Sequence, residues 1–490
     1  MESEKEFGDM SPEEFRRYGH RIIDWIADYL AETEKWPVLP RCLPGDTKAQ
    51  LPRHPPQSAD SMDAILGDFE RIIMPGITHW NHPGFFAYFS ITGSGPGILG
   101  ELLSSALNVN AMLWKTSPSA TELEEVALDW LRQLLGLPED FWGIIYDTAS
   151  NSTLHALAAA REVAPGLNAR DQGLCVPDVP RLSLYTSEQA HSSVEKAAIT
   201  LGIGRQGVRA IPVDDRFRMD IDALRASIQA DLQDGWQPFC VVATVGTTST
   251  TSVDPVPKIA EICAKHNIWL HVDAAYAGPA ALLPEKKWAL EGCERADSVV
   301  TNPHKWLFTP IDLSAFYCRK PEVLRQAFSL TPEYLKTDVD DRATNYMDYG
   351  VALGRRFRAL KLWMVIRFFG QEGLKERLRQ QIKWAEEFAT WIDASVEFER
   401  MAPTPFSTIC FRATPASLCK TLDNSEALDR FNEAVLEAVN DSGEVYLSHT
   451  RLHDRFTLRL AIGNLKTRRK HLERAKELLK SNVASLQDKL

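Results

Sequence analysis

Two stretches of the chain decide the fold: IWLHVDAAY at residues 268–276 and SVVTNPHKW at residues 298–306. Each begins with a short apolar run bounded by polar residues, which predicts a buried β-strand. Asp273 directly follows the first run, and Lys305 lies four residues beyond Thr301, where the second run ends. The 32 positions from Asp273 to Lys305 fit two strand ends that are joined by one helical crossover.

The same alternation continues outward in both directions, from about Gly95 to Lys320. Helical patterns follow several of the apolar runs, for example at Ser152–Arg161 and Val256–His266. This order predicts an α/β domain on a largely parallel sheet. The runs expected to form its strands are Gly143–Tyr146, Leu182–Tyr185, Phe239–Val245, Ile268–Val272, Ser298–Val300 and Ser314–Cys318.

The N-terminal segment has a different character. Ser11, Pro12 and Glu14 form a helix start with a capping box. The stretch Pro37–Pro56 contains six prolines and is expected to run extended over a surface. A lone amphipathic helix with an extended arm cannot bury its own apolar stripe. We expect it to pack on a partner subunit, with the main domain of the same chain as the alternative.

The C-terminal third predicts a smaller α+β unit. A long helix is expected at Arg355–Phe369, further helices at Glu426–Asn440 and Lys466–Leu479, and strands within Arg451–Ile462. A polar loop at about 328–348 precedes them, and composition allows either a lid or a static surface loop. The predicted units are residues 1–94, 95–369 and 370–490.

Composition bounds the class of protein. The chain has 490 residues and a formal net charge of −11, which argues against a nucleic-acid partner. The N-terminus has no apolar signal core, and no stretch is apolar enough to span a bilayer. None of the eight cysteines has disulfide or metal-ligand spacing, so we expect free thiols, no bound metal and a soluble, cytoplasmic protein.

Polar residues concentrate just after the predicted strands, where open α/β sheets bind their ligands. Lys305, beside His304 and Trp306, can be partly desolvated and so become a better nucleophile. Asp273 after a buried strand needs a partner, for which a cationic ring nitrogen is suitable. A solvated lysine and a salt-bridged aspartate are the ordinary alternatives for each residue taken alone.

Three further strand ends complete the pattern. Residues 147–153 place small and hydroxyl side chains at a helix start, which can bind an anion or merely cap the helix. His191 and the hydroxyl run Thr247–Ser252 follow two other strands and could equally be structural. Together, an anion cradle, an aromatic ring, a carboxylate and an amine meet the four needs of pyridoxal 5′-phosphate.

At this point the sequence resembles the aromatic L-amino-acid decarboxylases, the group II pyridoxal-phosphate decarboxylases. The similarity covers nearly the whole chain, and many motifs in one order are specific where a single motif is weak. The motifs are HWNHP (79–83), FFAYF (85–89), SPSATELE (117–124), QAHSS (189–193), HVDAAYAG (271–278), NPHKW (302–306), TPEYLK (331–336) and LGRRFR (353–358).

The resemblance implies a type I aminotransferase-like fold and a homodimer whose active sites are shared between subunits. Lys305 would bind the cofactor covalently, Asp273 would pair with its ring nitrogen and His191 would stack on the ring. Tyr334, on the mobile loop, would deliver or relay a proton. The other residues implied are Ala149, Ser150, Thr248, Asn302, His304 and Gly354 around the cofactor, and Trp80, Tyr88 and Phe89 around the substrate, with Asn110 and Met112 from the other subunit.

The chain departs from the family pattern at Ser90, where the family usually has proline. Asn110 and Met112 are also smaller or more polar than the usual residues. Gly354 resembles the glycine of indole-accepting members, which favours tryptophan among the aromatic substrates. The rival interpretations are an aromatic aldehyde synthase, against which Tyr334 and His191 argue, a decarboxylase of a non-aromatic amino acid, and a catalytically silent binding protein.

Overall fold

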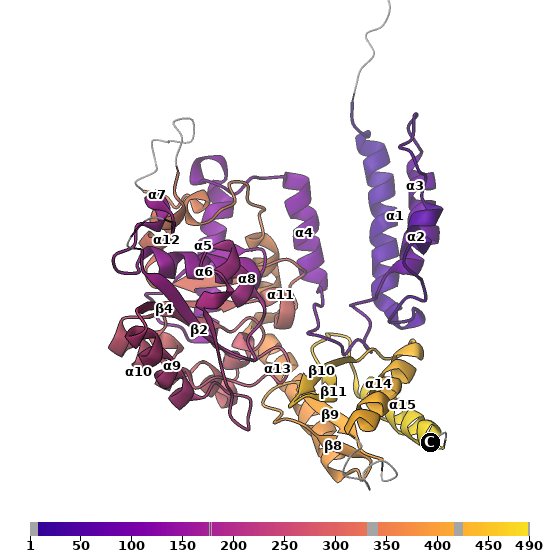
Figure 1. Ribbon diagram of the computed structural model, residues 1–490. Coiled ribbons are helices and arrows are strands. Elements are labelled where there is room, and N and C mark those ends of the chain that lie inside the picture. Colours follow the sequence, from indigo (N-terminus) through magenta and orange to yellow (C-terminus); the bar gives the residue numbers. More distant parts are fainter. Residues whose placement is uncertain (1–7, 176, 178, 331–341, 416–424, 489–490) are drawn as a thin grey trace, which may run out of the picture.

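The computed structural model describes residues 8–175, 177, 179–330, 342–415 and 425–488. Its larger sheet has seven strands in the order β1-β7-β6-β5-β4-β2-β3. Figure 1 labels β2 and β4 of this sheet. β7 is antiparallel to both neighbours, and the remaining adjacent pairs are parallel. Every strand of this sheet except β7 therefore ends at the same edge. The strands are β1 (Trp142–Tyr146), β2 (Arg181–Ser187), β3 (Val208–Ile211), β4 (Trp236–Thr244), β5 (Trp269–Asp273), β6 (Ser298–Thr301) and β7 (Ser314–Cys318).

Both faces of the sheet are covered, which explains its continuous apolar runs. Along β4, Val241 and Ala243 join one buried cluster, whereas Cys240 and Val242 join another on the opposite face. The second cluster also holds side chains of α6 and α8, and the first holds side chains of α5, α9 and α10. These helices are α5 (Pro118–Leu135), α6 (Ala149–Glu162), α8 (Ser193–Thr200), α9 (Ile221–Gln233) and α10 (Val256–His266).

A second sheet of four antiparallel strands lies in the C-terminal third, in the order β10-β11-β9-β8 (Figure 1). Its core is shared with the three long helices that follow or flank it. The strands are β8 (Phe398–Arg400), β9 (Thr408–Ala413), β10 (Ser448–Leu452) and β11 (Arg455–Ala461), and the helices are α13 (Ala359–Ala394), α14 (Ser425–Asp441) and α15 (Arg469–Gln487).

The helix expected at Arg355–Phe369 begins later than predicted. The Arg355 N–H donates to Asn110 Oδ1, and the Arg355 carbonyl accepts from the Ala111 N–H. These bonds hold residue 355 against another segment, so α13 starts only at Ala359. The label α13 covers two helices separated at Gly370, whose φ of 62° and ψ of 170° are not helical. The first of them therefore ends where the sequence predicted, at about Phe369, and the second continues to Ala394. The division of the chain at 369/370 stays a prediction.

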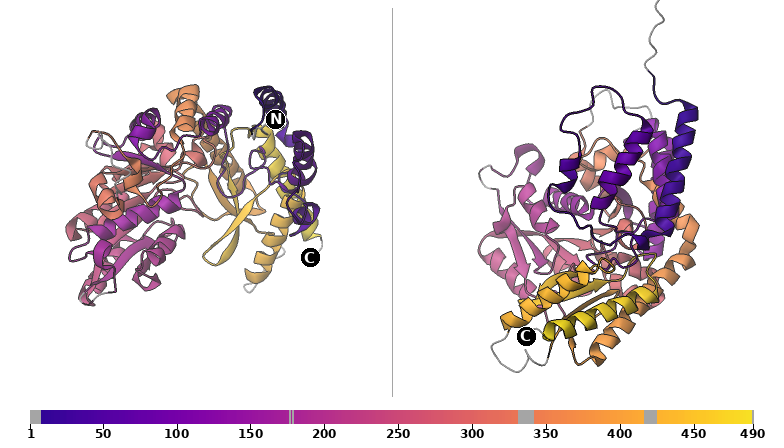
Figure 2. Two further views of the ribbon diagram at one scale, coloured as in Figure 1. Left: turned by 90° about the horizontal axis from the view of Figure 1, so that it is seen from above. Right: turned by 90° about the vertical axis from the view of Figure 1, so that its right-hand side faces the viewer.

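The N-terminal segment forms helices that extend away from the C-terminal unit (Figures 1 and 2). α1 (Pro12–Ala31) begins with the predicted capping box between Ser11 and Glu14. The stretch Pro37–Pro56 is not extended throughout, because α2 (Asp46–Gln50) lies within it. α3 (Met62–Asp68) and α4 (Gly95–Leu107) follow.

Two predictions from the sequence concern membrane-spanning helices and the state of the cysteines. Among the described residues, no helix has the length and apolarity needed to cross a membrane. The seven cysteines in the described part of the chain are all free thiols, although Cys42 and Cys175 are exposed rather than buried.

Tyr334 and most of the predicted mobile loop lie outside the described residues.

Candidate active site

The candidate site lies at the edge of the large sheet where the parallel strands end. Asp273 is the last residue of β5, and β6 ends beside it at Thr301. The chain then makes one helical turn, α11 (Pro303–Trp306), with Pro303 at its first position and Asn302 as N-cap. Lys305 is on this turn, and its N–H donates to the Asn302 carbonyl at 2.8 Å.

Burial makes Lys305 a better nucleophile than an exposed lysine. Desolvation lowers the pKa of its amine, the charge of Asp273 acts in the opposite direction, and the charge of Arg459 lowers the pKa further. The nitrogen lies 5.4 Å from the centre of the Phe89 ring. Asp273, Arg459 and Phe89 thus surround one partly desolvated amine.

Asp273 is a nearly buried carboxylate that ends its strand. Its Oδ1 accepts the Ala275 N–H at 3.0 Å. Its charge acts on the pKa of both Lys305 and His191. A buried carboxylate at this place can stabilise a cationic ring nitrogen.

His191 presents an accessible ring after the end of β2. Its Nδ1 accepts the Ser193 N–H at 3.2 Å, which leaves the proton of the neutral ring on Nε2. Desolvation lowers the pKa of His191, and the charges of Lys305 and Asp273 act on it with opposite signs. A neutral, accessible imidazole near these two groups can stack on a planar ligand.

The N-terminus of α6 offers a cradle for an anion. Ala149 and Ser150 are its first residues, and the N-cap Thr148 makes no side-chain capping bond. First-turn N–H groups and the helix dipole therefore favour a negative ligand. Asp147 at the same end is held by its own neighbours, since its Oδ1 accepts from the Asn151 side chain at 2.7 Å.

Asn302 and His304 lie at the start of α11, the helical turn that carries Lys305. Leu313 N–H donates to His304 Nδ1 at 2.9 Å, and His304 Nε2 lies 3.3 Å from Asn302 Nδ2. Burial lowers the pKa of His304 to about 4, so the ring is neutral at physiological pH. Asn302 Oδ1 is buried without a hydrogen-bond partner among the described residues, which leaves this amide free to bind a ligand.

Thr248 is exposed on the loop that follows β4. The loop is held tightly at Gly246, where φ is 89° and a Cβ would lie 2.6 Å from the Ala277 Cβ. Thr247 and Ser252, which flank Thr248 on the loop, bond through their hydroxyl groups at 3.0 Å. The loop is thereby fixed against the segment that follows Asp273.

Trp80, Tyr88 and Phe89 are here called the aromatic wall, and their rings pack in two separate stacks. The Trp80 and Tyr88 rings are stacked with centroids 5.9 Å apart. The Phe89 ring stacks on Tyr276 at 3.7 Å. Tyr88 adopts a φ of 50°, and its N–H donates to Ser448 Oγ at 3.1 Å, so a bond from the C-terminal sheet supports this unusual backbone.

Asn110, Met112 and Gly354 form a second group. Asn110 Nδ2 lies 3.4 Å from Met112 Sδ, and a Cβ on Gly354 would lie 3.9 Å from Asn110 Nδ2. Gly354 also lines a cavity of about 100 Å³ together with Asp147 and Asn151. This group therefore lies beside the N-terminus of α6 rather than in the aromatic wall.

Arg459 was not predicted from the sequence. It lies on β11, is 3% exposed, and its guanidinium carbon is 4.5 Å from the centre of the Phe89 ring. Nε donates to the Ser249 carbonyl at 2.9 Å and Nη1 donates to the Tyr88 carbonyl. Nη2 is buried without a hydrogen-bond partner among the described residues, so this cation can bind an anionic group. An arginine inside the apolar run Leu458–Leu460 was the signal available in the sequence.

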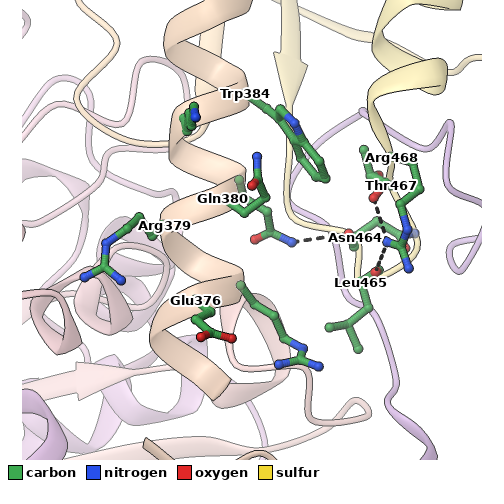
Figure 3. Close-up of a pocket in the computed structure, with 11 residues that line it drawn as sticks. Glu376, Arg379, Gln380, Trp384, Asn464, Leu465, Thr467 and Arg468 are labelled. Carbon is green, nitrogen blue, oxygen red and sulfur yellow. Dashed lines mark hydrogen bonds between the residues drawn. The ribbon is translucent and has the colours of Figure 1, made fainter. Parts of the chain in front are cut away.

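A separate cleft of about 620 Å³ lies between α13 and the loop before α15 (Figure 3). Its lining includes Arg377, Lys383 and Arg468. It contains neither Lys305 nor Asp273, so the strand-end site is the better candidate for chemistry.

Comparison with known proteins identifies the family. Residues 44–414 match the pyridoxal-dependent decarboxylase conserved domain. The chain belongs to the pyridoxal-dependent decarboxylase family. It is therefore a carboxy-lyase whose cofactor is pyridoxal phosphate, and the amine, carboxylate, imidazole and helix N-terminus described above fit that cofactor.

Relatives of this decarboxylase cover nearly its whole length. Tyrosine decarboxylase 3 of Petroselinum crispum is 40% identical, over 98% of this chain and 93% of the relative. Phenylacetaldehyde synthase of a Rosa hybrid cultivar is 38% identical, over 97% and 95%. The crystal structure of Oryza sativa TDC with PLP and tryptamine matches with a TM-score of 0.94 and 37% identity, covering 98% of this chain and 100% of that one. The decarboxylase thus has the type I fold that its sequence suggested.

Proposed function

We propose that this decarboxylase converts aromatic L-amino acids into arylalkylamines and CO₂, with tryptophan among its substrates. The observation that carries the proposal is the meeting of Lys305 and Arg459 at the Phe89 ring. An aromatic amino acid has an aromatic ring, an amino group and a carboxylate. The Phe89 ring can pack against the substrate ring, the Lys305 amine marks the place where the amino group reacts, and the Arg459 guanidinium can bind the carboxylate. The relatives include decarboxylases of tyrosine and tryptophan, which supports this class of substrate.

The cofactor residues are assigned as follows. Lys305 binds the cofactor through its amine, Asp273 keeps the ring nitrogen protonated and His191 stacks on the ring. When bound, pyridoxal phosphate supplies an aldehyde that reacts with amines and a ring that accepts the electrons left by departing CO₂. The residues assigned to its phosphate and surroundings are Ala149, Ser150, Thr248, Asn302, His304 and Gly354.

Arg459 is assigned to the substrate carboxylate. The free Nη2–H of a buried guanidinium makes a strong charge-assisted hydrogen bond. Its position over Phe89 would orient the amino acid between the aromatic wall and Lys305. Proton delivery after loss of CO₂ is assigned to Tyr334 from the sequence resemblance alone, because that residue lies outside the described part of the chain.

The active unit is proposed to be a homodimer. α4 exposes four leucines, at positions 99, 102, 103 and 107, and this spacing forms one apolar stripe. A groove of about 290 Å³ between α1 and α3 is also apolar, with Ile22, Trp25 and Phe69 in its lining. A second copy of the chain would cover these surfaces and bring its Asn110 and Met112 to the substrate pocket.

The rival reactions differ in their products. An aldehyde synthase would release aldehyde, ammonia and hydrogen peroxide in place of the amine. The test is a product assay of the holoenzyme with tryptophan, tyrosine, phenylalanine, glutamate and histidine. Amine and CO₂ in equal amounts from an aromatic substrate support the proposal. Aldehyde with peroxide, or amine from glutamate or histidine alone, contradicts it.

A further inference from the structure

A column of three stacked rings leads from the active site into the interior. Phe89 stacks on Tyr276 with centroids 3.7 Å apart and planes at 16°. Tyr276 stacks in turn on Trp306 at 4.9 Å and 8°. Phe89 faces Lys305, so the outer end of this column is a wall of the aromatic pocket and the inner end is the residue next to Lys305 in sequence.

The inner end of the column is held by Gln381. Trp306 Nε1 donates to Gln381 Oε1 at 2.7 Å. Trp306 is fully buried and Gln381 is 3% exposed, so solvent does not compete for this bond. The Trp306 indole nitrogen has a single N–H, and this bond uses it.

Gln381 also connects, through Asn464, to the segment that carries Trp80 of the aromatic wall. Its Nε2 donates to the Asn464 carbonyl at 3.2 Å. Figure 3 shows Asn464 facing α13. Asn464 Nδ2 donates to the carbonyls of Trp80 at 3.2 Å and His82 at 2.9 Å. One glutamine on α13 therefore links the segment carrying Trp80 to the column that ends at Phe89.

We propose that Gln381 is a positioning residue that sets the placement of Phe89 relative to Trp80 in the aromatic wall, and hence the selectivity of the enzyme between an indole and a single phenyl ring. It touches neither substrate nor cofactor and acts through Trp306 on one side and Asn464 on the other. The proposal rests on the proposed function, because it concerns aromatic substrates. Tyr276 has its own anchor, a bond of 2.6 Å between its hydroxyl and Ser407 Oγ, so the expected effect is moderate.

The test compares two adjacent glutamines on α13. Gln381→Met removes both hydrogen bonds while keeping a similar side-chain length. The ratio of kcat/KM for tryptophan to that for phenylalanine should move toward one by about five- to tenfold, the size expected for one buried hydrogen bond. The change should appear in KM, with kcat and the cofactor absorbance nearly unaltered. Gln380→Met, at the exposed neighbouring position, should leave the ratio as in the wild type.

A second variant keeps the test decisive if Gln381→Met fails to fold. Trp306→Phe removes the donor from the other side and keeps a ring in the column, and it should shift the same ratio. The double variant should change the ratio no more than Gln381→Met alone, since the one bond that Trp306→Phe breaks is already lost in Gln381→Met. A ratio within twofold of wild type in Gln381→Met, or an equal loss for all substrates, would overturn the inference. A wild-type enzyme that releases no amine from any aromatic amino acid would instead overturn the proposed function, and the inference with it.

Discussion

The side-chain nitrogen of Lys305 lies 5.4 Å from the centre of the Phe89 ring. The two residues come from different parts of the chain, since Lys305 follows β6 and Phe89 precedes α4. Arg459 reaches the same ring from the C-terminal sheet. The tertiary fold thus brings together the Lys305 amine, the aromatic wall and the Arg459 guanidinium. The role of each group can be tested separately.

Asp273→Asn should reduce kcat without removing the cofactor. An opposite charge shifts a pKa by roughly 1–3 units, so its loss should lower kcat by about 10- to 1000-fold. The measurement is steady-state kcat together with the visible absorbance of the purified holoenzyme. Loss of the cofactor in the Asn variant, or an unchanged kcat, would argue against the role of Asp273 at the ring nitrogen.

Arg459→Gln should raise KM for the amino acid and leave inhibition by the product amine almost unchanged. A hydrogen bond to a charged group contributes about 1.5–3 kcal/mol, so the rise in KM should be roughly 10- to 150-fold. The amine lacks the carboxylate and serves as the internal control for pocket shape. An equal weakening of amine and amino acid would mean that Arg459 only supports Tyr88 and Ser249.

Leu103→Glu should dissociate the enzyme. A charge in the exposed leucine stripe of α4 should be strongly unfavourable once a second copy covers that stripe. Sedimentation analysis should show monomers with little activity, because Asn110 and Met112 would no longer reach the partner's site. Leu232→Glu, at an exposed leucine on α9, is the matched control. Dimers with full activity in the Leu103 variant would place the interface elsewhere.

The free energy of unfolding should fall as the pH drops from about 6.5 to 4. Desolvation by burial lowers the pKa of His155 to about 4, although the bond of its Nδ1 to the Asn151 carbonyl and the charge of Asp147 act in the opposite direction. Its Nε2 accepts the Val351 N–H, and protonation of the ring would break that bond. The unfolded chain binds the proton more tightly, so the stabilising contribution is complete above the unfolded pKa of about 6.5 and is lost toward 4.

The measurement for His155 is the denaturation midpoint at several pH values. His155→Gln should flatten the decline between pH 6.5 and 4, whereas replacement of the exposed His54 should not. His82, His271 and His304 also have a pKa of about 4, so part of the decline should remain. An identical slope in wild type and His155→Gln would refute the assignment.

The arrangement of strand ends was predictable because it depends on local patterns. Buried parallel strands give continuous apolar runs, and all six predicted runs are strands of the large sheet. The order of these strands placed Asp273 and Lys305 at one edge. Strand β3 was missed, since Val208–Ile211 is short, lies at the sheet edge and contains the half-exposed Arg209.

Other features depend on packing between distant segments and could not be predicted in this way. Arg459 is buried because β11 packs against the Ser249 loop and the Tyr88 turn. The delayed start of α13 results from the pairing of Arg355 with Asn110 and Ala111. Gln381 on α13 gains its connections only when Trp306 and Asn464 meet it in the folded chain.

The most direct test of the account is to find which lysine carries the cofactor. Borohydride reduction makes the bond between lysine and cofactor permanent, and peptide mass spectrometry then locates it. We expect the pyridoxyl group on Lys305. Lys361 is the natural competitor, because it is also buried and its pKa is lowered by desolvation, but it is paired with Glu101 at 2.9 Å. A modified Lys361, or no modified lysine in a yellow, active enzyme, would contradict the account.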